Sequence, residues 1–311
     1  MDRLHLLTVF IAVADSQGFA SAARQLELSP PAVTRAIAAL EASLGVRLLT
    51  RTTRRVRLTE AGERYVEDCR RILGELAEAD ASASGQQATP RGRLAVTAPA
   101  VFGRRFVTPL VVDYLQRYPE VAATCWFVDR VVDLVDEGVD VGVRLGHLPD
   151  STLQAVRVGE VRRVVCASPA YLRAHGTPRL PADLATHAIV SASAVTRATS
   201  WRLGGPRQQP IDVPLQPRLV VSTNDAAVAA AEAGFGIARL MSYQVAEAVR
   251  AGRLRLLLAG YEEAPLPVHL VHREGRHASA KARSFLDLAI QRLRAEPDLA
   301  PGALARRRAS A

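Results

Sequence analysis

Residues 19–44 read FASAARQLELSPPAVTRAIAALEASL, two short amphipathic segments joined by a tight turn. The first segment has a small-residue face that includes Ala22 and Ala23, so a second helix can cross it closely. Apolar positions recur every three or four residues in the second segment, at Val33, Ile37, Leu40 and Leu44. Two short helices in this order predict a helix-turn-helix, whose second helix enters a DNA major groove.

The start and the polar face of the second segment carry the candidate DNA contacts. A serine before the first turn caps free amides, and proline is tolerated in that turn because its missing N–H is not needed. The same helix pair also occurs as plain core packing, so these residues alone leave both readings open. The candidate contacts are Ser29, Pro30, Pro31, Thr34 and Arg35.

Residues 45–58 contain five arginines and no acidic residue. Apolar residues flank a Thr-Thr-Arg-Arg turn, a pattern typical of a two-stranded wing that carries guanidinium groups to phosphates or into a minor groove. A solvated charged hairpin is the alternative, and the unbalanced charge makes it the weaker one. We expect Arg51, Arg54 and Arg55 to grip the DNA backbone.

Helices are expected on both sides of these elements, over residues 2–16 and 60–84. Apolar residues in the second of them follow a heptad and predict a dimer contact, whereas an isolated surface helix is the alternative. A dimer would let two modules read a pseudo-palindrome. The heptad positions are Tyr65, Cys69, Ile72, Leu76, Ala79 and Ala83.

Composition agrees with a DNA-binding protein of more than one domain. The chain has 311 residues, 49% of them hydrophobic, and its net charge of +9 with a pI near 10.2 favours a polyanionic partner. Because all but one of the basic residues are arginine, genome composition is an alternative cause, and the local cluster is the stronger evidence. No leader or long apolar span is evident, so we expect a cytoplasmic protein without membrane contact.

Residues that would indicate an enzyme or a metal site are missing. Cys69, Cys125 and Cys166 lack chelating spacing, and His269 and His272 point to opposite faces of an expected strand. Gly-x-Ser-x-Gly, Walker and His-Glu-x-x-His motifs are absent from the sequence, and Gly234-Phe-Gly236 lacks the third glycine of a dinucleotide fingerprint. We therefore expect no catalysis, no metal and no cofactor.

Beyond a small, polar hinge at 81–92, strands and helices alternate. This order predicts parallel sheets covered by helices, and it includes an expected helix over 130–137. Ligands of such sheets bind beyond the strand ends, near helix N-termini. Candidate effector residues at these ends are Thr97, Pro99, Ala100, Val101, Phe102, Arg144, Gly146, Ser222, Thr223 and Asn224. Helix capping is an equally good local reading of Thr223 and Asn224, and Trp201 would either wall a cleft or anchor a loop.

The chain resembles the LysR-type transcriptional regulators. The resemblance rests on Ala22-Ala23-x-x-Leu26, Ser29, Pro31-Ala32-Val33, Arg35-x-Ile37-x-x-Leu40-Glu41-x-x-Leu44-Gly45-x-x-Leu48, Arg51 and Leu58-Thr59-Glu60-Ala61-Gly62, and later on Ala98-Pro99, Phe102-Gly103, residues 129–134, 142–146 and 167–172. Pro30 and Thr34 replace the family's common glutamine and serine, which puts sequence preference in doubt, and Leu49 replaces phenylalanine conservatively.

The resemblance implies an α/β protein with a winged helix-turn-helix at 1–59, a linker or dimerisation helix and hinge at 60–88, and an effector domain at 89–295 with the two-lobed architecture of periplasmic binding proteins. Its lobes are expected at about 92–162 with 264–295 and at about 163–263, followed by a disordered tail at 296–311. The resemblance places the candidate effector residues at the cleft between the lobes.

The expected partners are double-stranded DNA at a promoter or operator, a small-molecule effector of unknown identity, and further copies of the chain in a dimer and a tetramer. RNA polymerase is a further candidate. Two other functions stay open: a small-molecule receptor with a vestigial DNA module, and an architectural DNA binder without an effector. The arginine-rich wing speaks against the first of these, and the two-lobed domain speaks against the second.

Overall fold

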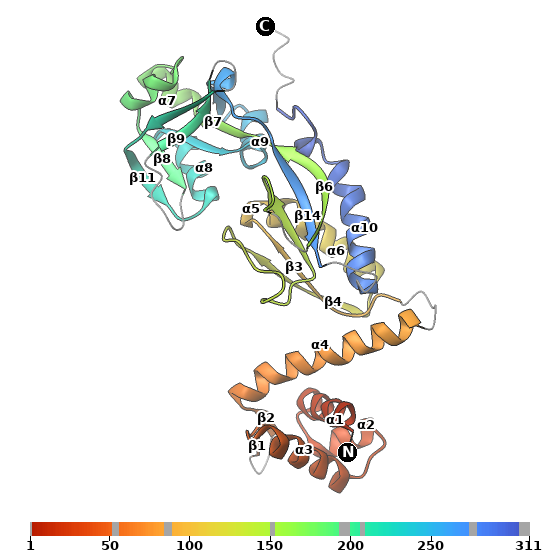
Figure 1. Ribbon diagram of the computed structural model, residues 1–311. Coiled ribbons are helices and arrows are strands. Elements are labelled where there is room, and N and C mark those ends of the chain that lie inside the picture. Colours follow the sequence, from red (N-terminus) through yellow and green to blue (C-terminus); the bar gives the residue numbers. More distant parts are fainter. Residues whose placement is uncertain are drawn as a thin grey trace. The chain divides into compact units, whose positions relative to one another are not determined.

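The computed structural model describes residues 2–51, 56–83, 89–149, 153–192, 200–205, 209–273 and 279–304. It divides into two compact units, Met1–Arg93 and Leu94–Ala311, which are considered separately (Figure 1). Among the described residues, no helix has both the length and the apolar character needed to cross a bilayer.

The first unit is a winged helix-turn-helix, as the sequence predicts. Its apolar core joins the first three helices, the wing and the start of the fourth helix. Gly62 is required where the fourth helix passes the wing, since an added Cβ would lie 2.1 Å from the Leu48 carbonyl oxygen. In chain order the elements are α1 Arg3–Ser16, α2 Phe19–Gln25, α3 Pro30–Leu44, β1 Leu49–Arg51, β2 Val56–Leu58 and α4 Glu60–Ala83.

The second unit has two lobes, each built on a sheet of five strands in the described part. The lobe 1 sheet has the order β4-β3-β5-β14-β6, from Val121–Phe127, Gly92–Ala98, Val141–Leu145, Leu266–His272 and Gln154–Val161. The lobe 2 sheet has the order β11-β8-β12-β7-β13, from Pro217–Val221, Ile189–Ala192, Ile237–Met241, Arg163–Ala167 and Arg255–Leu257. A β9–β10 hairpin, Ser200–Gly204 and Pro210–Pro214, packs on lobe 2.

The helices of this unit pack on the two sheets and connect their strands. Those of lobe 1 are α5 Ala100–Phe102, a π-helical turn Gly103–Val107, α6 Thr108–Arg117 and α10 Ala280–Arg294. Those of lobe 2 are α7 Pro169–His175, the 3-10 turn Pro181–Thr186, α8 Asn224–Glu232, α9 Ser242–Arg250 and the 3-10 turn Ala259–Tyr261. The described chain ends after a last 3-10 turn, η5, Pro297–Leu299.

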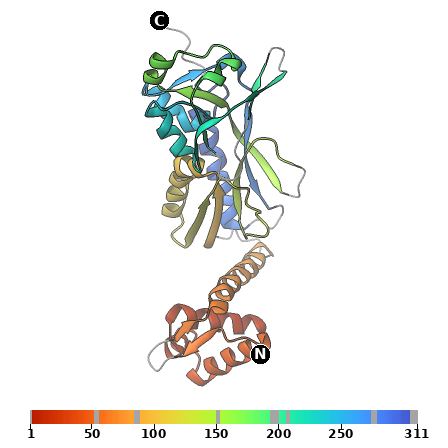
Figure 2. The same ribbon diagram turned by 90° about the vertical axis from the view of Figure 1, so that its left-hand side faces the viewer.

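The chain crosses between the lobes twice, which makes the sheets mixed instead of parallel. It leaves lobe 1 from β6 at Arg162 and returns to it in β14, which lies antiparallel beside both β5 and β6 (Figures 1 and 2). In lobe 2, β7 and β13 are likewise antiparallel to their neighbours. The prediction of parallel sheets therefore holds for part of each sheet, for β3 with β5 in lobe 1 and for β8 with β11 and β12 in lobe 2.

Two local expectations are wrong. Residues 130–137 form turns instead of a helix, because the Asp133 side chain accepts hydrogen bonds from the amides of Val135 and Asp136, at 2.8 and 3.1 Å, and so competes with helical bonding. The expected disorder from residue 296 does not hold for 297–304, where Asp298 and Leu299 are buried.

Candidate DNA-binding surface and effector cleft

The N-terminal half of α3 exposes most of the residues predicted to contact DNA. Ser29, Pro30, Pro31 and Arg35 are exposed, and Thr34 is half-buried. The Ser29 hydroxyl accepts a hydrogen bond from the Ala32 amide at 3.4 Å, and both prolines occupy the first turn. This part of α3 contains no acidic residue, so phosphate groups can approach it without repulsion.

The wing is held against α3 by one carboxylate. An oxygen of Glu41 accepts hydrogen bonds from the amides of Leu48 and Leu49, at 2.8 and 3.0 Å. Where β2 ends, the Thr59 hydroxyl donates a hydrogen bond to the Arg47 carbonyl and accepts one from the Gly62 amide. The second of these bonds caps the start of α4. Arg54 and Arg55, and the side chain of Arg51, lie outside the described residues.

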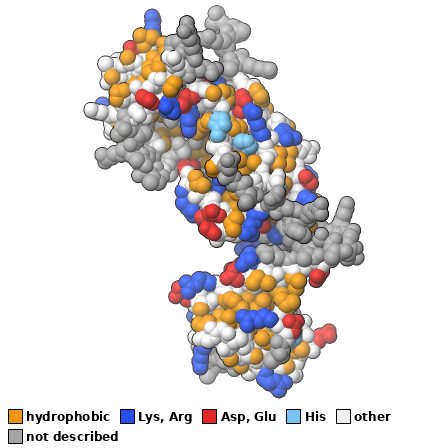
Figure 3. All heavy atoms as spheres, in the orientation of Figure 1, with side chains coloured by type: hydrophobic (Ala, Val, Ile, Leu, Met, Phe, Trp, Pro, Cys, Tyr) orange, Lys and Arg blue, Asp and Glu red, His pale blue; other side chains and the backbone are white. Residues whose placement is uncertain are grey.

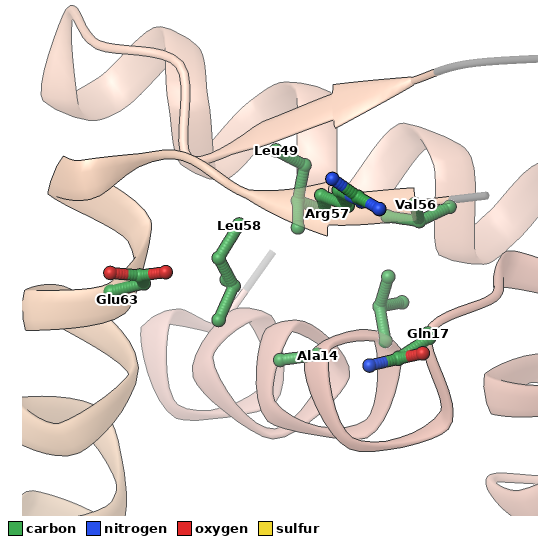
Figure 4. Close-up of a pocket in the computed structure, with 8 residues that line it drawn as sticks. Ala14, Gln17, Leu49, Val56, Arg57, Leu58 and Glu63 are labelled. Carbon is green, nitrogen blue, oxygen red and sulfur yellow. The ribbon is translucent and has the colours of Figure 1, made fainter.

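A groove of about 440 Å³ separates the wing from α1. Figure 4 shows Leu49 and Leu58 pointing from the wing toward the helix that carries Ala14 and Gln17. Glu63 of α4 borders the same groove. The groove belongs to the packing of the wing on the helices, and it lies away from the exposed face of α3.

Only part of the predicted α4 heptad is available to a second chain. Cys69 is fully buried in the unit's own core together with Val66, and Tyr65 packs against that core. Ile72 and Leu76 are exposed, and Figure 3 shows hydrophobic side chains gathered on the visible face of this unit. The side chains of Ala79 and Ala83 lie outside the described residues.

A cavity of about 430 Å³ lies between the lobes of the second unit. This volume is in the range of small-molecule sites. Lobe 1 contributes Pro99 after β3, residues 128–131 after β4 and the end of β5, and lobe 2 contributes β7, β8, β9, β12 and the starts of α8 and α9. Of the predicted effector residues, Pro99, Arg144, Trp201 and Asn224 line it.

The other predicted effector residues do not line this cavity. Thr97 is buried and donates to the Trp126 carbonyl, while Val101 and Phe102 belong to the lobe 1 core. Gly146 is buried with a positive φ of 102°. Ala100 and Thr223 are adjacent to the lining residues Pro99 and Asn224, and Ser222 lies two positions before Asn224. The Thr223 hydroxyl caps α8 by accepting from the Ala226 amide at 3.3 Å. Trp201 both walls the cavity and packs in the lobe 2 core.

Asp129 joins the two lobes at this cavity and was not predicted. One carboxylate oxygen accepts from the Ala100 amide of lobe 1 at 3.0 Å, and the other accepts from the side-chain amide of Asn224 in lobe 2 at 3.1 Å. Asn224 is therefore more than a helix-start residue. The sequence signal was present, since residues 129–134 carry part of the family resemblance, but nothing local pairs Asp129 with Asn224.

Arginines dominate the charge of the cavity wall. Arg130 is neutralised by Glu137 at 2.7 and 2.9 Å, whereas Arg163 and Arg239 share the single carboxylate of Glu263. Within the described part of the chain, Arg144 donates to the backbone carbonyls of Val132 and Val143 and has no carboxylate at ion-pair distance.

Burial lowers the pKa of Arg144, and nearby Asp133 offsets this only in part. Burial also lowers the pKa of Arg239, whose Nε has no hydrogen-bond partner within the described residues. Guanidinium groups stay protonated in proteins despite such shifts. The cavity therefore presents more positive than negative charge to a ligand.

The cysteines do not contribute to either site. Burial raises the pKa of the Cys166 thiol to about 12 and raises those of Cys69 and Cys125 as well. Thiols in such surroundings are poor nucleophiles and poor metal ligands. Within the described residues no cluster of three metal-ligating side chains occurs.

A winged helix-turn-helix followed by a two-lobed domain with a ligand-sized cavity defines the class of effector-responsive DNA-binding proteins. Comparison with known proteins gives the family. The model of the LysR substrate binding domain matches residues 87–294, and that of the bacterial regulatory helix-turn-helix protein, lysR family, matches residues 4–63.

Individual relatives match along most of their length. An HTH-type transcriptional repressor of Pseudomonas aeruginosa is 33% identical, with 98% of this chain and 97% of that protein covered. The HTH-type transcriptional activator AaeR of Escherichia coli is 33% identical over 88% of each chain. The solved structure of CrgA, a LysR-type regulator from Neisseria meningitidis, superimposes with a TM-score of 0.60 at 31% identity, covering 93% of this chain and 98% of that one.

The chain belongs to the LysR-type transcriptional regulators. It has a helix-turn-helix DNA-binding domain and an effector-binding substrate domain.

Proposed function

We propose that the exposed face of α3 reads an operator in the major groove, with Thr34 and Arg35 at base edges and Ser29, Pro30 and Pro31 against the backbone. The observation that carries this proposal is the geometry of α3, whose capped first turn is exposed and free of acidic residues. Arg51, Arg54 and Arg55 of the wing are proposed to bind flanking phosphates.

Selection of genomic DNA fragments over a salt series, followed by sequencing, tests this proposal. We expect a few discrete sites with partial dyad symmetry. Salt-sensitive retention of all fragments would favour an architectural protein, and no retention would favour a receptor with an inactive DNA module.

Variants then separate base contacts from phosphate contacts. Arg35→Ala should weaken binding to a selected site by about 1–3 kcal/mol and relax sequence preference. Arg51→Ala should weaken binding to all sequences and reduce the salt slope by about one unit. Arg64→Ala is the control, because Arg64 is an exposed arginine of α4 paired with Glu60. An unchanged salt slope in Arg51→Ala would contradict the wing assignment.

We also propose that the interlobe cavity takes a small effector with one anionic group, held by Arg144 and Arg239. Pro99, Trp201 and Asn224 would contact the rest of the molecule. The excess of guanidinium groups over carboxylates on the cavity wall supports this proposal.

The sequence contains two tryptophans, Trp126 and Trp201, of which only Trp201 lines the cavity. A Trp126→Phe protein therefore reports on the cavity through Trp201 fluorescence. Small carboxylates, each paired with its neutral amide, serve as probes. A saturable response to carboxylates alone, lost in Arg144→Gln, is expected. Equal responses to the amides would refute the anionic class.

The remaining assignments are part of the same proposal. The domain limits are those expected from the sequence except that residues 297–304 belong to the effector domain. Helix α4 joins two chains in a dimer through its exposed apolar residues, and effector domains assemble the tetramer. The protein acts in the cytoplasm, where its DNA partner is, contacts RNA polymerase, and has no catalytic activity. An effector that prefers one arrangement of the effector domains would change the angle between the DNA modules.

A further inference from the structure

The segment after α10, residues 297–304, packs back onto the second unit and is called here the C-terminal strap. Its 3-10 turn buries Asp298 and Leu299, which are 5% and 1% exposed. A buried carboxylate needs cationic partners to offset its desolvation. The partners of Asp298 come from both lobes.

One carboxylate links a cation of lobe 1 to a cation of lobe 2. Arg250, at the end of α9, donates to the two oxygens of Asp298 at 2.6 and 3.0 Å. Arg105, in the π-helical turn of lobe 1, forms an ion pair with the same carboxylate and also donates to the Tyr243 carbonyl. A bidentate arginine fixes the direction as well as the distance of its carboxylate partner. The contacts of Asp298 therefore hold the two lobes in one relative orientation.

The strap also contacts the first crossing of the chain. An added Cβ at Gly159 of β6 would lie 2.7 Å from the Leu299 carbonyl oxygen, so the strap backbone lies directly on this strand. Arg162 donates to the Ala303 carbonyl at 2.7 Å and forms a buried ion pair with Glu262 of the second crossing. The strap therefore contacts lobe 1, lobe 2 and the connection between them.

Helix α9 connects the strap with the cavity. Its second and third residues, Tyr243 and Gln244, line the cavity, and Tyr243 packs against Phe102 and Phe106 of lobe 1. Its last residue, Arg250, is bound to Asp298. Because a helix is stiff over nine residues, a shift of its far end relative to lobe 1 must change the cavity wall.

We infer that Asp298 is a positioning residue: the C-terminal strap sets the angle between the lobes, and through α9 the width of the effector cavity. This role goes beyond effector binding itself. The strap limits the relative motion of the lobes to arrangements that keep Arg105 and Arg250 on one carboxylate.

Spin labels on the two lobes of the full-length chain test the inference. Val112→Cys in α6 and Leu180→Cys in lobe 2 give exposed label sites, in a Cys125→Ser background that leaves only the buried Cys69 and Cys166. Labelled chains are diluted with unlabelled chains, so that the distances measured by pulsed electron paramagnetic resonance are those between two labels on one chain.

Asp298→Asn, which preserves shape and removes charge, should broaden the interlobe distance distribution and extend it to longer distances. Arg250→Gln should have the same effect on the distance distribution. It keeps the test decisive if Asp298→Asn does not fold, because about half of the Arg250 side chain is exposed and its replacement leaves the core unchanged. Arg253→Gln is the matched control, because Arg253 is equally exposed near the same helix end but, among the described residues, its ion pairs are with Glu232 and Glu247 of lobe 2. A chain ending at Leu304 should behave as the parent.

A purely local packing role predicts a different result. In that case Asp298→Asn and Arg250→Gln would lower the melting temperature and leave the distance distribution as narrow as in the parent, which would overturn the inference. Equal broadening in Arg253→Gln would overturn it as well. Neither readout uses DNA or effector, so failure here is distinct from failure of the proposed function.

Discussion

Two of the charged contacts between the lobes differ in burial. At the strap, Asp298 and the Arg162–Glu262 pair are nearly enclosed by protein. At the second contact, called here the rim, Arg104 of lobe 1 pairs with Asp225, the residue after Asn224 in lobe 2, at 3.1 Å while their side chains are 69% and 57% exposed. Exposed pairs contribute little because water screens them, whereas removing one partner of a buried pair leaves an uncompensated charge. The Arg104–Asp225 pair can therefore break at small cost, whereas the ion pairs of the strap are costly to break.

The largest expected effect is loss of the Asp298 carboxylate. Asp298→Ala removes the buried carboxylate and leaves Arg105 and Arg250, which are 25% and 47% exposed, without their shared partner. Because water partly solvates these guanidinium groups, the unfolding free energy of the second unit should fall by about 2 kcal/mol. Urea unfolding followed by circular dichroism measures it. A loss below about 1 kcal/mol would mean that the strap is as weak as an exposed pair.

A steric change at the strap should come next. Gly159→Ala forces a Cβ to within 2.7 Å of the Leu299 carbonyl oxygen, and overpacking of this kind costs about 1–3 kcal/mol. Gly260→Ala is the control, since no atom lies within 4 Å of its added Cβ. Equal unfolding midpoints for the two variants would show that the strap backbone moves away freely.

Acidification provides a smaller effect that acts on both lobes. Burial lowers the pKa of His187 in lobe 2 and of His269 on β14. In the unfolded chain these two histidines have a pKa of about 6.5. The unfolded state therefore binds more protons than the native state as the pH falls below that value. The contribution of these histidines to the free energy of unfolding should be fully present above about pH 6.5. It should fall as the pH decreases toward their pKa values in the folded state. Unfolding measured from pH 7.5 to 5.5 should show a shallower decline in His187→Gln and His269→Gln. An unchanged slope in both would exclude these groups as its cause.

The smallest effect belongs to the rim. Arg104→Ala should change the unfolding free energy by no more than about 0.5 kcal/mol, because both partners are exposed. The same thermal or urea melts used for Asp298→Ala allow a direct comparison. A loss as large as that of Asp298→Ala would remove the contrast between rim and strap.

The first unit was predictable because its signals are local. Ser29 caps α3, Gly45 ends it with a φ of 69°, and the apolar period of α3 identifies its buried face, all within one stretch of chain. The α4 heptad was less informative, because an apolar side chain such as Cys69 packs equally well inside its own unit or against a second chain, and sequence period alone does not distinguish these.

The cavity was predicted less completely. Strand ends and helix starts identified Pro99, Arg144 and Asn224, because ligand sites of α/β sheets lie at such ends. The cavity residues Asp129 and Arg239 were missed, since each lines a site that exists only when the two lobes face each other. Residues 130–137 failed as a helix because Asp133 binds two backbone amides, and in the turns that form instead Val132 and Leu134 are buried with Val271, far away in the sequence.

By itself the sequence determined the winged helix-turn-helix, the alternation of strands and helices, the family and the arginine-rich character of the chain. Periodicity, helix capping and composition depend on residues that are close in the chain, so they can be read directly from the sequence. Only the tertiary structure decided that Asp129 would join Asn224, and that Asp298 would bind Arg105 and Arg250. These contacts depend on how two lobes, connected by two crossings of the chain, are oriented, and no short segment encodes that orientation.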